Sequence, residues 1–274
     1  MDKKNKKDSL GNRMKEYESV SKTRLTRRTP VIIRLDGKAF HTFTKGFQKP
    51  FDDLFIKTMQ DTMLHLCKNI QNCVFGYTQS DEITLVMVDY KNIGTSSWFD
   101  NEIQKIVSTS AAMATAYFNK RFADNFVTLF PDNCDSISQK IIDVYRLRIN
   151  SANATFDSRC FNVPREEVNN CLVWRQQDAI RNSVQMLGRY KYSDKQLFKK
   201  SCETIKEMLC KDYDIKWSEL SSVKQRGSCA VRRNFTTIQG DEEIERRLWV
   251  IDERIPIFSE QPHYINNLVI LDNE

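Results

Sequence analysis

The sequence has no long hydrophobic run and no secretory signal. No apolar stretch in its 274 residues approaches the ~20 that a membrane-spanning helix requires, which excludes a transmembrane protein. The N-terminus is the basic segment MDKKNKKDSLGNRMK, which has no apolar core and mixes lysine with acidic residues, unlike a signal or transit peptide. We therefore expect a soluble cytoplasmic protein without membrane contact.

Zinc-type ligand spacing is also absent. None of the eight cysteines forms a Cys-x-x-Cys pair, and the three histidines are scattered among them. In an intracellular chain of this size, reduced and mostly buried thiols are expected.

The remaining composition is that of an ordinary globular protein. Of the residues, 40% are hydrophobic and 28% are charged, which argues against extended disorder. The length fits one large domain or two small ones. The formal net charge of +6 permits a polyanionic partner without requiring one.

Hydrophobic periodicity predicts an α+β fold. The order of elements is a strand at 31–35, a helix at 52–70, hairpin strands at 73–77 and 83–88, a helix at 99–120 and a strand at 156–163. This is the ferredoxin-like βαββαβ order. We therefore divide the chain into a core at 1–163, which includes the N-terminal helix, and, at 164–274, a helical appendage with C-terminal strands packed on the core.

In the second part we expect two helices within 165–211 and then short strands. Ser193 is predicted to cap the second helix. The strands are predicted at Ser228–Val231, Leu248–Ile251 and Leu268–Leu271. Trp174, in the first helix, is expected to be a core residue rather than a base-stacking platform.

Two acids are placed by this topology at neighbouring strand ends. Asp36 ends the first strand and Asp81 lies in the hairpin turn, so their carboxylates can converge, as a pair of Mg²⁺ ions requires. Glu82 follows Asp81, but regular strand geometry directs it to the opposite face, and it ranks lower as a ligand. Taken singly, each acid could equally be an ordinary turn former.

The segment after the first acid is a candidate triphosphate site. Backbone amides in Gly37-Lys38-Ala39-Phe40-His41 could hold phosphates, and Phe40 or His41 could contact a base or sugar. Lys45, Lys49 and Lys105 are further candidates for phosphate contacts, although any one of them could be a solvated surface charge.

Three long motifs closely resemble the tRNA-His guanylyltransferase superfamily. They are RLDGKAFHTFTKGFQKPFD (34–52), GYTQSDEITLV (76–86) and WRQQDAIRNS (174–183). Shorter stretches that fit the same family are LGNRMKEYE (10–18), FDSRCFNVP (156–164) and KQRGS (224–228). Together they cover the chain in order from about residue 9 to 230.

The resemblance implies a palm-like enzyme that adds nucleotides to the 5′ end of tRNA, extending it 3′ to 5′. It implies that Asp36, Asp81 and Glu82 are catalytic, and that Asp36, Asp81 and the Gly37 carbonyl bind two Mg²⁺ ions. ATP and GTP would be substrates. The nucleotide pocket would comprise residues 36–41 (Asp36, Gly37, Lys38, Ala39, Phe40, His41), Ser80, Asp81, Lys49, Asp52 and Lys105.

One departure separates the chain from the eukaryotic tRNA-His enzymes. They carry His-Ile-Asn-Asn-Leu-Tyr-Asn-Thr after Trp-Arg-Gln and an Asp, whereas this chain has Ile180 to Leu187, without the histidine. It therefore resembles the guanylyltransferase-like branch, which repairs 5′-truncated tRNA by templated addition. Addition of G at position −1 of tRNA-His is the alternative, and a palm-domain nucleotide cyclase or a non-catalytic tRNA-binding protein represents another class.

Basic residues in and near the appendage are candidate tRNA contacts. They are Arg159, Arg175, Arg181, Lys224, Arg226, Arg232 and Arg233, with Asn182 equally placed for tRNA contact or helix packing. Shape, rather than sequence, is the expected basis of duplex recognition. The resemblance also implies a homotetramer with tRNA bridging subunits.

Overall fold

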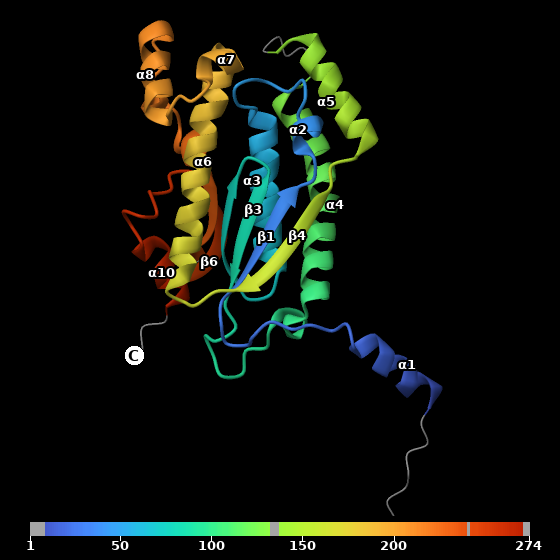
Figure 1. Ribbon diagram of the computed structural model, residues 1–274. Helices are drawn as coiled ribbons and strands as arrows, with labels where there is room; N and C mark the ends of the chain where they lie inside the picture. Colours follow the sequence, from blue (N-terminus) through green and yellow to red (C-terminus); the bar gives the residue numbers. More distant parts are fainter. Residues whose placement is uncertain (1–8, 132–136, 240–241, 271–274) are drawn as a thin grey trace, which may run out of the picture.

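A six-stranded antiparallel sheet organises the protein (Figure 1). The computed structural model describes residues 9–131, 137–239 and 242–270. The strand order is β4-β1-β3-β2-β5-β6. The strands are β1 (Val31–Gly37), β2 (Cys73–Gln79), β3 (Glu82–Met87), β4 (Phe156–Asn162), β5 (Ser228–Gln239) and β6 (Glu242–Asp252). The predicted α+β class and the βαββαβ order of the first part are confirmed.

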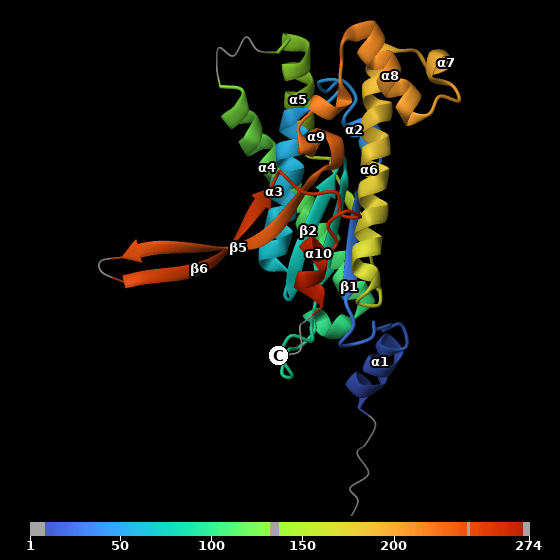
Figure 2. The same ribbon diagram turned by 90° about the vertical axis from the view of Figure 1, so that its left-hand side faces the viewer.

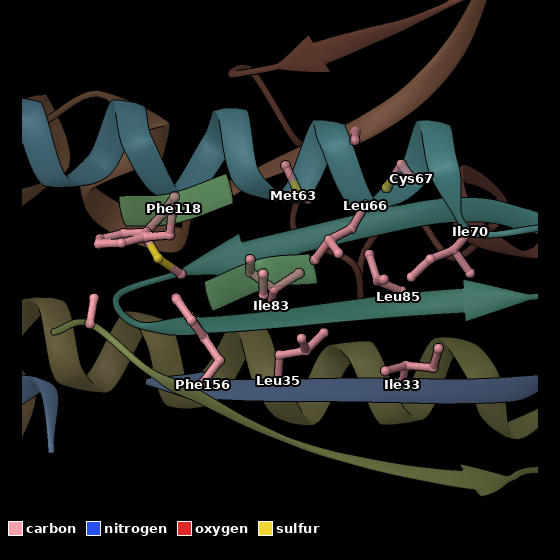
Figure 3. Close-up of a cluster of buried hydrophobic side chains, with 14 of the residues drawn as sticks. Ile33, Leu35, Met63, Leu66, Cys67, Ile70, Ile83, Leu85, Phe118 and Phe156 are labelled. Atoms are coloured by element: carbon pink, nitrogen blue, oxygen red, sulfur yellow. The ribbon is translucent and has the colours of Figure 1, made fainter. Parts of the chain in front are cut away.

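Two long helices cover one face of the sheet. They are α3 (Asp53–Asn69) and α4 (Ile103–Leu129). Apolar residues of β1 and β3, such as Leu35 and Ile83, point into the same cluster as Met63 of α3 and Phe118 of α4 (Figure 3). Because side chains alternate along a strand, Arg34, Asp36 and Glu82 lie on the other face.

That other face is packed by residues from the second part of the chain. Val168 and Leu172 of α6 (Glu167–Lys191) and Ile265 of α10 (His263–Val269) form a core with Ile32 and Phe75. β5 pairs with β2, so the second part also extends the sheet. The β5–β6 hairpin projects from the body (Figure 2).

The remaining helices are short or peripheral. They are α1 (Leu10–Ser19), α2 (Phe40–Phe43), η1 (Trp98–Asn101), α5 (Gln139–Ser151), α7 (Asp194–Leu197), α8 (Cys202–Tyr213), η2 (Trp217–Glu219) and α9 (Ser222–Arg226). None of the helices in the described ranges is long and apolar enough to cross a membrane.

Three local predictions need correction. The helix expected at 99–120 begins at Ile103 and continues to Leu129. Ser193 caps only the one-turn α7, and Ser201 caps α8, the longer helix. The segment expected as a strand at 268–271 is helical through Val269, because Ile265 and Val269, four residues apart, are buried on one helix face; residue 271 lies outside the described residues.

Candidate active site

The end of β1 meets the β2–β3 turn at one end of the sheet. Asp36 is directly opposite Glu82 in the β1–β3 register, and the Gly37 amide donates to the Asp81 carbonyl at 3.0 Å. Only Ser80 and Asp81 separate the two hairpin strands, and Ser80 has the positive φ (48°) that such a tight turn demands. The turn therefore places Asp81 next to Asp36.

Like charge and burial dominate the electrostatics of this pair. Burial raises the pKa of Asp81, and the nearby Asp36 carboxylate raises it further. Burial also raises the pKa of Asp36, as does Asp157, against the opposing effect of Arg159 and the other nearby arginines. Within the described part of the chain no ion pair joins either acid to a cation.

This arrangement fits a hard divalent cation. Two partly buried carboxylates and the Gly37 carbonyl are oxygen donors of the kind that Mg²⁺ prefers. The described residues contain no group of three His, Cys, Asp or Glu side chains that could enclose an ion by themselves. Substrate oxygens would therefore have to complete the coordination, as is usual for Mg²⁺ in phosphoryl transfer.

Glu82 differs from the other two acids. Its side chain is buried on the α6 side of the sheet, where it accepts from Arg175 at 3.1 Å and lies 3.9 Å from Arg34. Burial raises its pKa in spite of these arginines. The expected catalytic carboxylate is thus engaged in an internal ion pair, and Arg175, predicted to contact tRNA, is buried as its partner.

A cavity of about 280 Å³ adjoins Asp81. Its walls come from the loop at 40–55, the turn at 79–81, α6 and α9. Predicted residues in its wall are Phe40, His41, Lys49, Asp52, Ser80, Asp81, Asn182, Lys224 and Arg226. Sequence reasoning missed its apolar wall residues Phe51, Met186 and Val223, because no local spacing signals that α6 and α9 close over a loop more than 100 residues earlier.

The segment after Asp36 is less open than predicted. Phe40 is buried among Phe43, Phe118 and Phe156, so its ring packs in the core and cannot stack on a base. A side chain on Gly37 would lie 2.4 Å from the Phe40 ring, which explains the glycine. The amide of Lys38 donates to the Thr155 carbonyl, and its side chain and Ala39 are exposed outside the cavity wall.

Asp52 orders the cavity loop from within. It caps α3 by accepting from the Phe55 amide at 2.8 Å, and it accepts from the Gln48 amide at 3.0 Å and the Tyr145 hydroxyl at 2.5 Å. With these partners its carboxylate holds the 48–55 turn, which forms part of the cavity wall. Its predicted place near the triphosphate stays a prediction.

Lys105 lies at the far end of the sheet. It lies in the first turn of α4, beside Glu102, whose backbone forms a β-bridge with Arg24 ahead of the start of β1. Phe118, which packs against Phe40 near the carboxylates, is about 20 Å further along the helix. Within one chain Lys105 therefore does not reach the nucleotide cavity, which corrects that prediction.

The candidate tRNA contacts are in different environments. Arg159 and Arg181 are exposed beside Asp157 and Asp178, whereas Lys224 pairs with Asp53 at 2.9 Å. Arg226 is half-buried and donates to the Ile255 carbonyl, Asn182 is exposed at the cavity, and Arg232 and Arg233 are exposed on β5. Trp174, expected in the core, is 54% exposed.

A palm-like antiparallel sheet with two acids at adjoining strand ends and a cavity of about 280 Å³ beside Asp81 fits a nucleotidyltransferase. A family model described as Thg1, tRNAHis guanylyltransferase, matches residues 11–164. The chain belongs to this family.

Solved structures and a curated relative agree with this assignment. A bacterial tRNA(His) guanylyltransferase (Thg1)-like protein in complex with ATP has a TM-score of 0.77 and 34% identity, covering 96% of this chain and 100% of its own. Its complex with GTP has a TM-score of 0.71 at the same identity and coverage. The tRNA(His) guanylyltransferase of Debaryomyces hansenii is 26% identical over 80% of this chain and 79% of its own.

Proposed function

We propose that this nucleotidyltransferase repairs 5′-truncated tRNA by templated addition of nucleotides in the 3′-to-5′ direction. The observation that carries the proposal is the Asp36–Asp81 carboxylate pair beside a cavity of nucleotide size. The repair reaction is favoured by the stretch Ile180 to Leu187, which lacks the histidine of the eukaryotic tRNA-His enzymes. Similarity to a Thg1-like protein over nearly the whole chain supports the same branch.

Asp36, Asp81 and the Gly37 carbonyl would hold two Mg²⁺ ions. When bound, the ions neutralise phosphate charge and polarise the attacking and leaving oxygens. Burial raises the pKa of both acids, and a bound divalent cation would offset the charge of the two carboxylates there.

The cavity would hold the nucleoside triphosphate. Phe51, Met186 and Val223 supply an apolar wall for the base, and His41 and Lys49 are exposed at the loop where phosphates would lie. The complexes of the bacterial relative with ATP and with GTP support both nucleotides as substrates.

The chemistry consists of two in-line displacements. In the first, an oxygen of the tRNA 5′ monophosphate attacks the α-phosphorus of ATP, and pyrophosphate leaves. In the second, the 3′-hydroxyl of the incoming nucleotide attacks the 5′ phosphate of the RNA, and AMP leaves. A 5′ triphosphate needs no activation and loses pyrophosphate directly. One carboxylate pair can serve both steps, because each needs the same charge neutralisation.

The same proposal includes a cytoplasmic homotetramer. The β5–β6 hairpin, which projects from the body, is a structural candidate for contact with another subunit or with tRNA (Figure 2). Sedimentation of the purified protein with and without tRNA tests the assembly.

The decisive experiment supplies Mg²⁺, ATP and four labelled nucleoside triphosphates to a tRNA that lacks its first 5′ nucleotide. We expect addition of the Watson–Crick partner, ending at full length, with both 5′-monophosphate and 5′-triphosphate ends. Full-length tRNA-His is the comparison. Addition of G only, to tRNA-His and regardless of the opposing base, would identify the tRNA-His activity instead; no addition to either RNA would direct attention to a cyclase or a binding protein.

A further inference from the structure

Trp174 is an exposed aromatic residue on α6, close to Val168 and Leu172, which pack on the sheet. It is 54% exposed, whereas Trp98 is buried and Trp217 and Trp249 are half-buried. A single exposed apolar side chain is ordinary on a protein surface, so the groups that surround the ring decide what it can do.

Its indole lies beside two arginines on the sheet face that carries Asp36. The guanidinium carbon of Arg34 is 5.6 Å from the ring centre, and Arg34 is two residues before Asp36 on the same face of β1. The guanidinium carbon of Arg175 is 3.5 Å from the ring centre. Trp174 does not line the nucleotide cavity. A substrate that contacts Trp174 would therefore reach Asp36 from outside this cavity.

The neighbouring sheet surface is open. Figure 1 shows β3 next to α6 and then β1 and β4, with no helix drawn in front of these last two strands. Arg159 and Asp157 of β4 are exposed there, opposite Arg34 and Asp36 in the register. The surface thus presents an aromatic ring and cationic groups next to the acids, a combination suited to a base and its phosphates.

The arginines beside the ring, Arg34 and Arg175, are mostly buried. The Nε atoms of Arg34 and Arg175 are buried and have no hydrogen-bond partner among the described residues, and the Arg175 side chain is 9% exposed. Asp36, Asp157 and Asp178 also face this region, and Asp157 and Asp178 pair with Arg159 and Arg181. The alternative ligand, an acidic peptide, matches this surface less well, because it lacks the flat base that a nucleic acid can stack on the exposed indole.

We propose that Trp174 stacks on the terminal base pair of the acceptor stem and thereby holds the RNA 5′ phosphate over Asp36 and Asp81. This inference rests on the proposed function, because it takes the RNA end as the second substrate. The nucleotide would enter from the cavity and the RNA from the open face of β1 and β4. Trp174 is then an RNA-positioning residue, without a part in proton transfer or metal binding.

The test uses an acceptor-stem RNA with 2-aminopurine in its terminal base pair. We expect the wild-type protein to quench the 2-aminopurine fluorescence, and Trp174→Ala to remove most of the quenching. The KM for RNA should rise about tenfold or more, within the range of base–aromatic stacking, with the KM for the nucleoside triphosphate unchanged. Trp174→Phe should restore most of both effects.

Tyr190→Ala is the matched control, because Tyr190 is similarly exposed (49%) on the same helix but about 24 Å further along it. It should leave quenching and both KM values unchanged. Equal quenching and equal KM for RNA in Trp174→Ala would overturn the proposal. A rise in the KM for the nucleotide alone would also overturn it, by assigning the ring to the incoming nucleotide.

The two proposals fail differently. If the wild-type protein adds nucleotides and Trp174→Ala behaves identically, the stacking inference is wrong and the proposed function stands. If the wild-type protein quenches 2-aminopurine through Trp174 but adds no nucleotide, the stacking inference stands and the proposed function is wrong.

Discussion

At the scale of single residues, the two strand-end acids carry the proposed chemistry. We expect Asp36→Asn and Asp81→Asn each to lower nucleotide addition by roughly 10³-fold or more, because each removes a metal carboxylate. The affinity for tRNA, measured by filter binding, should stay within a few fold.

Asp157→Asn is the control for this prediction. Asp157 lies opposite Asp36 on β4 but is exposed and pairs with Arg159 at 3.2 Å. It should retain most activity. If Asp36→Asn and Asp81→Asn lost tRNA binding to the same extent as activity, the two acids would be structural.

The Glu82–Arg175 pair should act on stability more than on chemistry. Both side chains are buried, so Arg175→Met leaves an unpaired carboxylate with only Arg34 nearby. We expect a loss of about 2–4 kcal/mol in the free energy of unfolding, measured by urea denaturation. The double variant Glu82→Gln, Arg175→Met should recover much of this loss in stability, because it leaves no unpaired charge. If it does not, the loss comes from the packing of the Arg175 side chain and not from the unpaired carboxylate.

At the scale of elements, Asp61 joins the two helices behind the sheet. It is buried in α3 and accepts from Arg121 at 2.9 Å and Asn125 at 3.0 Å on α4, and it pairs with Lys57. Burial alone would raise the pKa of Asp61, but the hydrogen bonds from Lys57, Asn125 and Arg121 lower it overall.

This pKa gives a pH dependence with a definite sign. A carboxyl whose pKa is lower in the folded state stabilises the protein above its unfolded pKa and loses that contribution as the pH falls through the folded value. Asp61→Asn should therefore destabilise the protein by about 1–3 kcal/mol from pH 7 to 5. The difference from wild type should shrink below about pH 4; a difference independent of pH would show that charge is not involved.

At the scale of the whole molecule, the division at residues 163 and 164 can be tested directly. Phe75 and Ile32 of the first part are buried against Val168 and Leu172 of the second, and β5 covers the edge of β2. We expect the fragment 1–163 to be insoluble or unfolded by circular dichroism, because it would expose this apolar face and a free strand edge. A soluble fragment with cooperative unfolding would establish two independent domains.

Binding of tRNA should depend steeply on salt. The chain has a net charge of +6, and exposed arginines lie on α6, β4 and β5. If about 5–7 phosphates are neutralised, the slope of log Kd against log salt concentration should be about 4 to 6. A slope near 1 would mean that recognition is mainly non-ionic.

Local sequence determined the order of elements and the placement of the two acids. Interactions between near neighbours in the chain produce hydrophobic patterns of period 2 in strands and 3.6 in helices. Such patterns predicted the strand before Asp36, the helix at 52–70 and the hairpin around Ser80 and Asp81. Asp36 and Asp81 could be placed at adjacent strand ends because the βαββαβ order leaves few ways to pair the strands.

Tertiary structure alone decided what each side chain does. Trp174 is exposed and Arg175 buried although they are neighbours, because Glu82, 93 residues away, pairs with the arginine. Phe40 is in the core, Asp52 is a helix cap bonded to Tyr145, and Lys105 is at the far end of α4. Sequence pattern fixes which residues can form an element, but burial and pairing depend on segments that meet only when the sheet closes.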